Sequence, residues 1–102
     1  MENKNNTFQI ILHAGNAKSL AMEAIYLSRE SKFDEAKEKL KEAESELVEA
    51  HKQQSSLLFE EANDKTQNVS VILCHSLDHV TMASLTCEMA EEIIMLREER
   101  TK

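Results

Sequence analysis

The chain has 102 residues, no proline, one glycine and a formal net charge of −7, from 19 acidic and 12 basic side chains. Sheets need turns, and turns draw on glycine, proline, asparagine and aspartate. A chain this poor in glycine and proline and rich in helix-forming residues is therefore expected to be one all-α domain spanning residues 1–102. Because its basic residues are interleaved with glutamate and it has one tyrosine, three phenylalanines and no tryptophan, binding of nucleic acid is not expected.

The sequence also argues against membrane insertion and secretion. Uninterrupted apolar stretches such as Val71–Cys74 fall far short of the roughly 20 residues that a bilayer span needs. Residues 1–6 are polar, lack the pattern of a signal peptide and are expected to be disordered. Cys74 and Cys87 would lie about 20 Å apart on one helix, too far for a disulfide. Two reduced thiols predict a cytoplasmic protein.

A first helix is expected from about residue 7 to residue 29. Small residues recur along it at a spacing of three and four, which places them on one face and allows close approach of another helix. These positions carry Ile10, Ala14, Ala17, Ala21, Ala24 and Ser28. Gly15 lies beside this stripe, and because a glycine within a helix costs about 0.5–1 kcal/mol relative to alanine, a packing or access role is expected for it.

A second helix is expected over residues 33–62, after a short connection. Ser31 and Asp34 have the spacing of a capping box, with aspartate in the acidic position. The apolar seam then steps alternately by three and four residues, a heptad pattern that predicts left-handed supercoiled packing. It comprises Phe33, Ala36, Leu40, Ala43, Leu47, Ala50, Gln54 and Leu57, of which Gln54 is polar.

A third helix, over residues 69–100, is apolar on two faces. One stripe comprises Val71, His75, Asp78, Met82, Leu85, Met89 and Leu96; the other comprises Val69, Ile72, Ser76, Val80, Ala83, Cys87, Ala90 and Ile94. A helix in a three-helix monomer needs only one buried face. The second face therefore predicts a homo-oligomer whose central seam is built by this third helix.

A cluster of histidines and aspartate interrupts the third helix. His75, Asp78 and His79 stand at i, i+3 and i+4 and so share one side of the helix. Three interpretations remain open from spacing alone. The histidines could be satisfied in an oligomer core, or could perform nucleophilic or phosphoryl chemistry. They could also bind a hydrolytic metal with a third ligand from His51 or Glu60.

Asp78 lies on the same stripe as Met82 and Leu85. If this stripe forms an oligomer axis, the carboxylates of neighbouring chains converge there, and like charges so close need a proton or a bridging cation. A shared structural metal on the axis is therefore predicted, and a ring of carboxylates favours a hard divalent ion such as Mg²⁺.

Three motifs in order resemble a known family over about residues 8–98. They are Ala14-Gly15-Asn16-Ala17-Lys18-Ser19-Leu20; Phe33-Asp34-Glu35-Ala36 with Glu49-Ala50-His51-Lys52-Gln53-Gln54; and His75-Ser76-Leu77-Asp78-His79. The chain resembles the enzyme IIA component of the lactose/cellobiose (N,N′-diacetylchitobiose) class of the bacterial sugar phosphotransferase system. It departs from that pattern at Leu77, where the family usually has glutamine, and at Val80-Thr81-Met82.

The resemblance implies a three-helix antiparallel bundle that assembles as a homotrimer of nine helices. It implies that His75 takes a phosphoryl group from the phosphocarrier HPr and passes it to a cysteine of the cognate enzyme IIB, with His79 and Gln54 near the phosphohistidine. Asp78 would point to the three-fold axis, where three copies share one divalent cation. The alternative is a degenerate or regulatory helical oligomer in which the change at Leu77 marks lost transfer.

Overall fold

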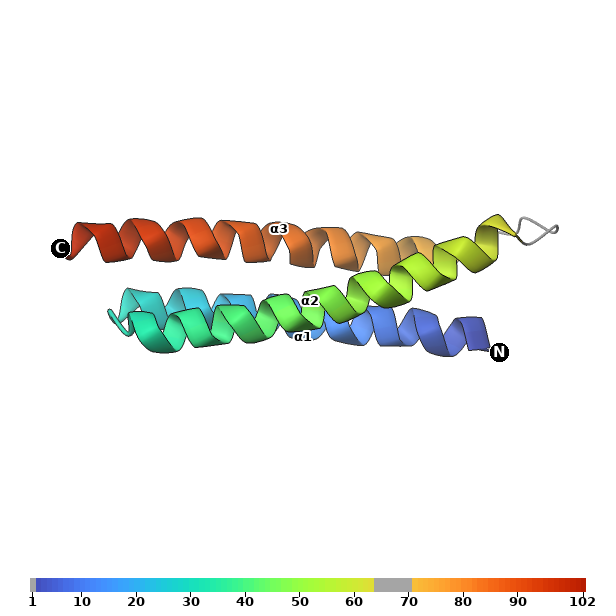
Figure 1. Ribbon diagram of the computed structural model, residues 1–102, viewed down its shortest axis with the longest axis horizontal. Coiled ribbons are helices and arrows are strands. Elements are labelled where there is room, and N and C mark those ends of the chain that lie inside the picture. Colours follow the sequence, from blue (N-terminus) through green and yellow to red (C-terminus); the bar gives the residue numbers. More distant parts are fainter. Residues whose placement is uncertain (1, 64–70) are drawn as a thin grey trace.

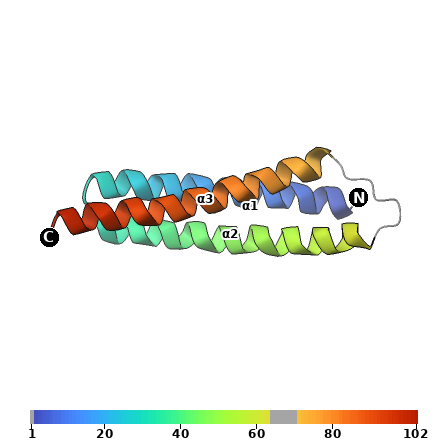
Figure 2. The same ribbon diagram turned by 90° about the horizontal axis from the view of Figure 1, so that it is seen from above.

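A computed structural model describes residues 2–63 and 71–102, with the backbone alone for residues 2–6. These residues form three α-helices and no strand: α1 (Glu2–Arg29), α2 (Phe33–Ala62) and α3 (Val71–Arg100). Consecutive helices run in opposite directions along a rod (Figures 1 and 2) with extents of 58 × 17 × 17 Å. The predicted all-α, three-helix antiparallel bundle is confirmed. Within the described residues, no helix is long and apolar enough to cross a membrane.

The helix bounds agree with the prediction for α2 and differ at the start of α1. α1 begins at Glu2 rather than at residue 7, so residues 2–6, predicted to be disordered, are helical. Thr7 and Ile10 are buried, and once packing holds this turn, each further residue extends the helix at little cost. The predicted residues 69 and 70 of the third helix lie outside the described residues.

The core of the bundle is built largely from alanine. On α1 the side chains of Ala14, Ala17, Ala21 and Ala24 are at most 1% exposed, as the spacing of small residues predicted. The seam of α2 contributes Ala36, Leu40, Ala43, Ala50 and Leu57 to the same cluster. Because methyl groups are short, the three helices approach closely and the rod is narrow.

The two faces of α3 have different environments. The face toward α1 and α2 is buried and comprises Leu73, Ser76, Val80, Ala83, Cys87, Ala90 and Ile94. The opposite stripe keeps large apolar side chains exposed: Val71, Met82, Leu85, Met89 and Leu96 are 46–87% exposed. We call these five residues the outward stripe. A single chain therefore buries only one of the two apolar faces, as predicted.

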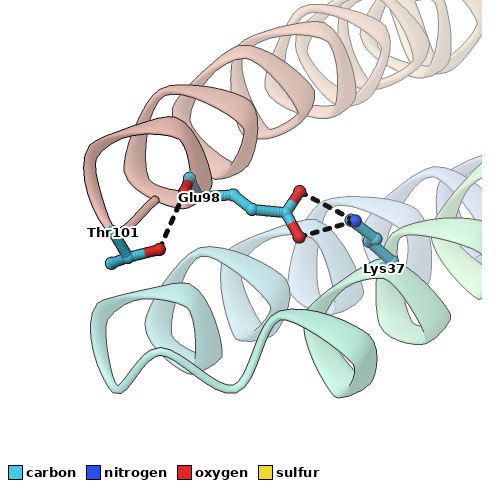
Figure 3. Close-up of polar contacts among 3 residues, drawn as sticks. All are labelled: Lys37, Glu98 and Thr101. Atoms are coloured by element: carbon cyan, nitrogen blue, oxygen red, sulfur yellow. Dashed lines mark hydrogen bonds and ion pairs between the residues drawn. The ribbon is translucent and has the colours of Figure 1, made fainter.

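Polar contacts attach the carboxyl end of α3 to both other helices. Arg97 Nη1 donates to the carbonyl oxygen of Ile25 and to Ser28 Oγ, each at 2.9 Å. Such hydrogen bonds from a charged donor contribute about 1.5–3 kcal/mol, and these two join α3 to the last turns of α1. Lys37 of α2 pairs with Glu98 at 2.8 Å (Figure 3). This hydrogen bond lowers the pKa of the Glu98 carboxyl, although an exposed pair adds little stability.

The turn between α1 and α2 differs from the predicted capping box. Ser31 has a φ of 62°, and its amide donates to Ser28 O while the amide of Lys32 donates to Leu27 O. These two bonds form a Schellman motif that ends α1 with Ser31 in the left-handed position usually taken by glycine. The amino terminus of α2 follows at Lys32 without a side-chain cap. The Ser31–Asp34 capping box was therefore wrong, because Ser31 completes the preceding helix instead.

Replacing Ser31 with glycine is expected to stabilise the protein. A left-handed residue with a Cβ is strained, and relief of this strain exceeds the extra entropy of an unfolded glycine, for a net gain of about 0.5–1 kcal/mol. Urea unfolding at one fixed protein concentration measures the change. Ser31→Ala, which keeps the Cβ, serves as the control and should show no gain. Equal effects of the two substitutions would contradict this account of the turn.

Candidate functional site

Two histidines on α3 form a hydrogen-bonded pair at the protein surface. Nε2 of His75 lies 3.0 Å from Nε2 of His79, and the rings meet edge to face with centroids 4.4 Å apart and an interplanar angle of 87°. Between two neutral imidazoles such a contact needs one Nε2–H donor and one Nε2 acceptor. His75 is exposed and His79 is half-buried. The predicted proximity of the two side chains is thus present within one chain.

Buried neighbours determine the direction in which this pair points. Ser76 is fully buried, and its hydroxyl donates to the carbonyl oxygen of Leu73 at 2.7 Å. Val80, one turn further, is also buried. Because these two residues hold one side of α3 against the core, His75 and His79 are turned away from it.

His79 lines a surface cavity of about 490 Å³ together with residues of α1. The α1 residues are Gly15, Lys18, Ser19, Met22, Glu23 and Tyr26. Lys18, which the sequence showed only as part of a motif, lines this cavity and is exposed. Gly15, Ser19, Met22 and Tyr26 follow helical spacing, a signal that could have placed this face of α1 against the histidines. Besides His79, the cavity is lined by one cationic residue, Lys18, and one anionic residue, Glu23.

Gly15 occupies open space rather than a tight contact. A Cβ built at this residue would meet nothing within 4 Å. Close packing between helices of one chain is therefore not the reason for this glycine, and its place in the cavity beside His79 favours the predicted role in access.

Asp78 and Gln54 lie apart from the cavity that His79 lines. Asp78 is exposed, and its position in the sequence places it on the side of α3 that carries the outward stripe. Gln54 lines a different cavity of about 350 Å³ between α2 and α3, with His51, Val80, Thr81, Ser84, Leu85 and Glu88. Neither His75 nor His79 lines it. A single chain thus brings the two histidines together but does not add Gln54 to them.

A single chain does not bring together the ligands that a hydrolytic metal centre would need. Among residues 7–63 and 71–102, no group of three or more His, Cys, Asp or Glu side chains could hold a metal ion. His51, one of the third ligands considered, lies in the Gln54 cavity. Since a hydrolytic centre of this type needs three protein ligands, the pair His75 and His79 alone does not build one.

His13 of α1 and Cys87 of α3 take part in contacts within the bundle. His13 pairs through Nδ1 with the carboxylate of Glu46 on α2, a contact that the sequence did not predict. The cysteines are both free, as predicted, with Cys74 exposed and Cys87 buried. Burial raises the pKa of the Cys87 thiol, and the nearby charges of Glu44 and Glu88 raise it further. Cys87 is therefore held as an unreactive thiol in the core.

Leu77 takes part in packing. It is half-buried and contacts the hydrophobic core. At this position the family pattern has glutamine, whereas in this chain Leu77 makes apolar contact with the bundle.

The fold and the histidine pair define a small helical protein with an accessible imidazole, and sequence comparison assigns its family. A family model described as "PTS system, Lactose/Cellobiose specific IIA subunit" matches residues 5–98. The chain therefore belongs to the lactose/cellobiose-specific IIA family of the sugar phosphotransferase system, as its motifs predicted. A relative from Bacillus subtilis (strain 168), the lichenan-specific phosphotransferase enzyme IIA component, is 41% identical over 95 residues, covering 93% of this chain and 86% of the relative.

Solved structures agree with this assignment. The cellobiose-specific enzyme IIA of Bacillus anthracis superimposes with a TM-score of 0.91 at 36% identity, over 99% of this chain and 93% of that one. The IIA(chitobiose) in its solution complex with HPr, from the diacetylchitobiose branch of the Escherichia coli phosphotransferase system, gives a TM-score of 0.87 at 28% identity. That comparison covers 100% of this chain and 99% of the other.

Gly15→Ala is expected to raise the free energy of unfolding by about 0.5–1 kcal/mol, because alanine favours the helix and the new methyl group has room. Urea unfolding measures this gain. Asn16→Ala is the matched control, since Asn16 is exposed next to it and outside the cavity; it should gain a similar or smaller amount. A loss of stability in Gly15→Ala alone would mean that another chain packs against this position.

Proposed function

We propose that this chain is a phosphocarrier in which His75 accepts a phosphoryl group from phosphorylated HPr and passes it to a cysteine of the cognate enzyme IIB. Membership of the IIA family supports the general role. The similarity to an Escherichia coli IIA solved in complex with HPr supports the donor. The observation that carries the proposal is the exposed imidazole of His75, with its Nε2 atom held 3.0 Å from Nε2 of His79.

In the accepting step, the Nε2 lone pair of His75 attacks the phosphorus of the donor's phosphohistidine. This tautomer of His75 carries its proton on Nδ1, and His79 Nε2–H is then the donor in the contact between the rings. As the new N–P bond forms, the donor's N–P bond breaks and its electron pair returns to the donor's imidazole. The His79 hydrogen bond can then move from His75 Nε2 to a phosphoryl oxygen.

In the passing step, the thiolate of enzyme IIB attacks the same phosphorus. An S–P bond forms, the N–P bond to His75 breaks, and the electron pair returns to Nε2. Imidazole is both a good nucleophile and, in a phosphoramidate, a good leaving group, so transfer can proceed in either direction. The protein's contribution is positioning and electrostatic stabilisation, supplied by His79 and by Lys18, which lines the neighbouring cavity.

The active assembly is a homotrimer with α3 at its centre. The outward stripe exposes large apolar side chains along α3, interrupted by His75 and Asp78 between Val71 and Met82, and such an apolar surface favours burial against further copies of the chain. His79 is displaced by about 100° around the helix from Asp78 and lines the cavity on the α1 side. His79 therefore lies at the margin of the stripe, and the exposed His75, on the edge of the stripe, holds its Nε2 atom close to it. Gln54 would join a phosphohistidine from a neighbouring copy, since within one chain it lines another cavity.

Asp78 of each of the three copies would bind one divalent cation on the axis. One exposed carboxylate per chain, on the apolar stripe, fits a site that is completed only by assembly. Carboxylate oxygens suit a hard cation such as Mg²⁺, which would neutralise the repulsion among the three charges. The ion would be structural and would take no part in phosphoryl transfer.

Incubation with phosphoenolpyruvate, enzyme I and HPr tests the carrier role. Intact mass should show an acid-labile gain of about 80 Da per chain, the mass of one phosphoryl group, located by fragmentation at His75. His75→Ala should show no gain and should keep its helical circular dichroism, because the side chain is exposed.

The absence of a gain with a competent HPr would overturn the carrier role and favour the degenerate or regulatory oligomer. Leu77→Gln is then the variant in which rescue should be sought. A gain located at His79 instead of His75 would contradict the assignment of the nucleophile.

Asp78→Leu tests the axial carboxylates. The substitution replaces three buried like charges with apolar volume, which is often neutral or stabilising. The variant should remain trimeric by sedimentation equilibrium and lose any dependence on Mg²⁺ or on a chelator that the unmodified protein shows. A monomeric Asp78→Leu variant would show that this account of the axis is wrong.

A further inference from the structure

We infer that His75 and His79 together form a bidentate site for a borderline divalent transition metal such as Ni²⁺, and that this ion and the phosphoryl group exclude each other at His75 Nε2. The metal site itself rests only on the geometry of the pair. The mutual exclusion rests in addition on the proposed phosphocarrier function.

The separation of the two nitrogens suits chelation. They lie 3.0 Å apart, and metal–imidazole bonds of about 2.0–2.1 Å to both would give an N–metal–N angle of about 90–100°. This angle is near the 90° of octahedral or square-planar coordination, which Ni²⁺ and Cu²⁺ adopt, and below the tetrahedral angle that Zn²⁺ prefers. Because the helix already holds both imidazoles one turn apart, most of the conformational entropy of the two side chains is lost before the metal binds, which favours binding.

The surroundings allow the remaining coordination positions to be filled by water. His75 is exposed, and within the described residues no third His, Cys, Asp or Glu joins the pair. Two neutral nitrogen donors select borderline transition metals over Mg²⁺, which prefers oxygen ligands. The pair therefore differs in chemistry from the Asp78 carboxylates, which suit a hard cation.

One lone pair serves both ligands. Metal binding uses the Nε2 lone pair of His75, which is the nucleophile of the accepting step, and the ring contact with His79 is replaced by two metal–nitrogen bonds. Conversely, an N–P bond at Nε2 leaves no lone pair there for a metal. Each ligand must therefore weaken the binding of the other, as thermodynamic linkage requires of two ligands that compete for one atom.

Calorimetric titration of the untagged, unphosphorylated protein with NiCl₂ in chelator-free buffer tests the site. Nickel is preferred to copper as the probe because copper can oxidise the exposed Cys74. One ion per chain is expected to bind. His79→Gln should weaken binding by about tenfold or more, since a single imidazole then replaces a chelate.

His51→Gln is the matched control, because His51 is an exposed histidine in a different cavity, and it should leave the affinity unchanged. Equal affinity of the unmodified protein and His79→Gln, or loss of binding in His51→Gln, would overturn the site. Excess MgCl₂ should not displace the nickel; displacement would also overturn it.

Phosphorylation of the unmodified protein in the presence of Ni²⁺ tests the mutual exclusion. The initial rate of mass gain should fall as nickel occupancy rises and should recover with a chelator, while phosphorylation of HPr in the same mixture stays unchanged. An unaffected rate at saturating nickel would overturn the exclusion. If the protein binds nickel as expected but is not phosphorylated even when nickel is absent, the carrier proposal fails and the metal site stands. If the protein is phosphorylated but binds no nickel, the metal site fails and the carrier proposal stands.

Discussion

The close approach of the three helices along an alanine-lined face of α1 is the constraint on which the rest of the molecule depends. Ala14, Ala17, Ala21 and Ala24 are almost wholly buried, and their methyl groups leave little distance between helix axes. A rod 17 Å wide has room for only one face of each helix inside it. Because burial stabilises roughly in proportion to apolar area, an alanine core also contributes less per residue than one of leucine or phenylalanine.

This narrow core divides α3 into sides with different uses. The side with Ser76, Val80 and Ala83 is buried and determines the rotation of the helix. The opposite side exposes the outward stripe. Near the border between these sides, His79 lines the cavity on the α1 side and His75 is exposed to solvent. The rotation of α3 thus determines together which residues are buried, where the outward stripe is exposed and where the histidine pair lies.

The histidine pair illustrates how a polar group is kept on an otherwise apolar helix. Each imidazole has the other as a hydrogen-bond partner, and the exposure of His75 avoids the cost of burying an unpaired polar group. The same exposure makes the nitrogen accessible to a partner protein. For that reason it is also accessible to small ligands that bind imidazole, and the proposed competition between a metal and the phosphoryl group follows from this shared atom.

Helix content, the bounds of α2, the inward stripes and the adjacency of His75 and His79 could all be predicted from sequence, because they depend on local spacing. The motifs also identified the family. The start of α1 and the turn at Ser31 could not be predicted, because packing of Thr7 and the hydrogen bonds of the Schellman motif compete with local capping preferences. Residue-by-residue packing also put Leu77 partly against the core.

Local periodicity by itself therefore determined the three helices and the residues that share each face. Only the tertiary structure decided which cavity each polar side chain enters. It placed Lys18 and Gly15 beside His79, and Gln54 in the separate space between α2 and α3. The physical reason is that these relations depend on how one helix is rotated and shifted against another, and that rotation is set by contacts between residues far apart in the sequence.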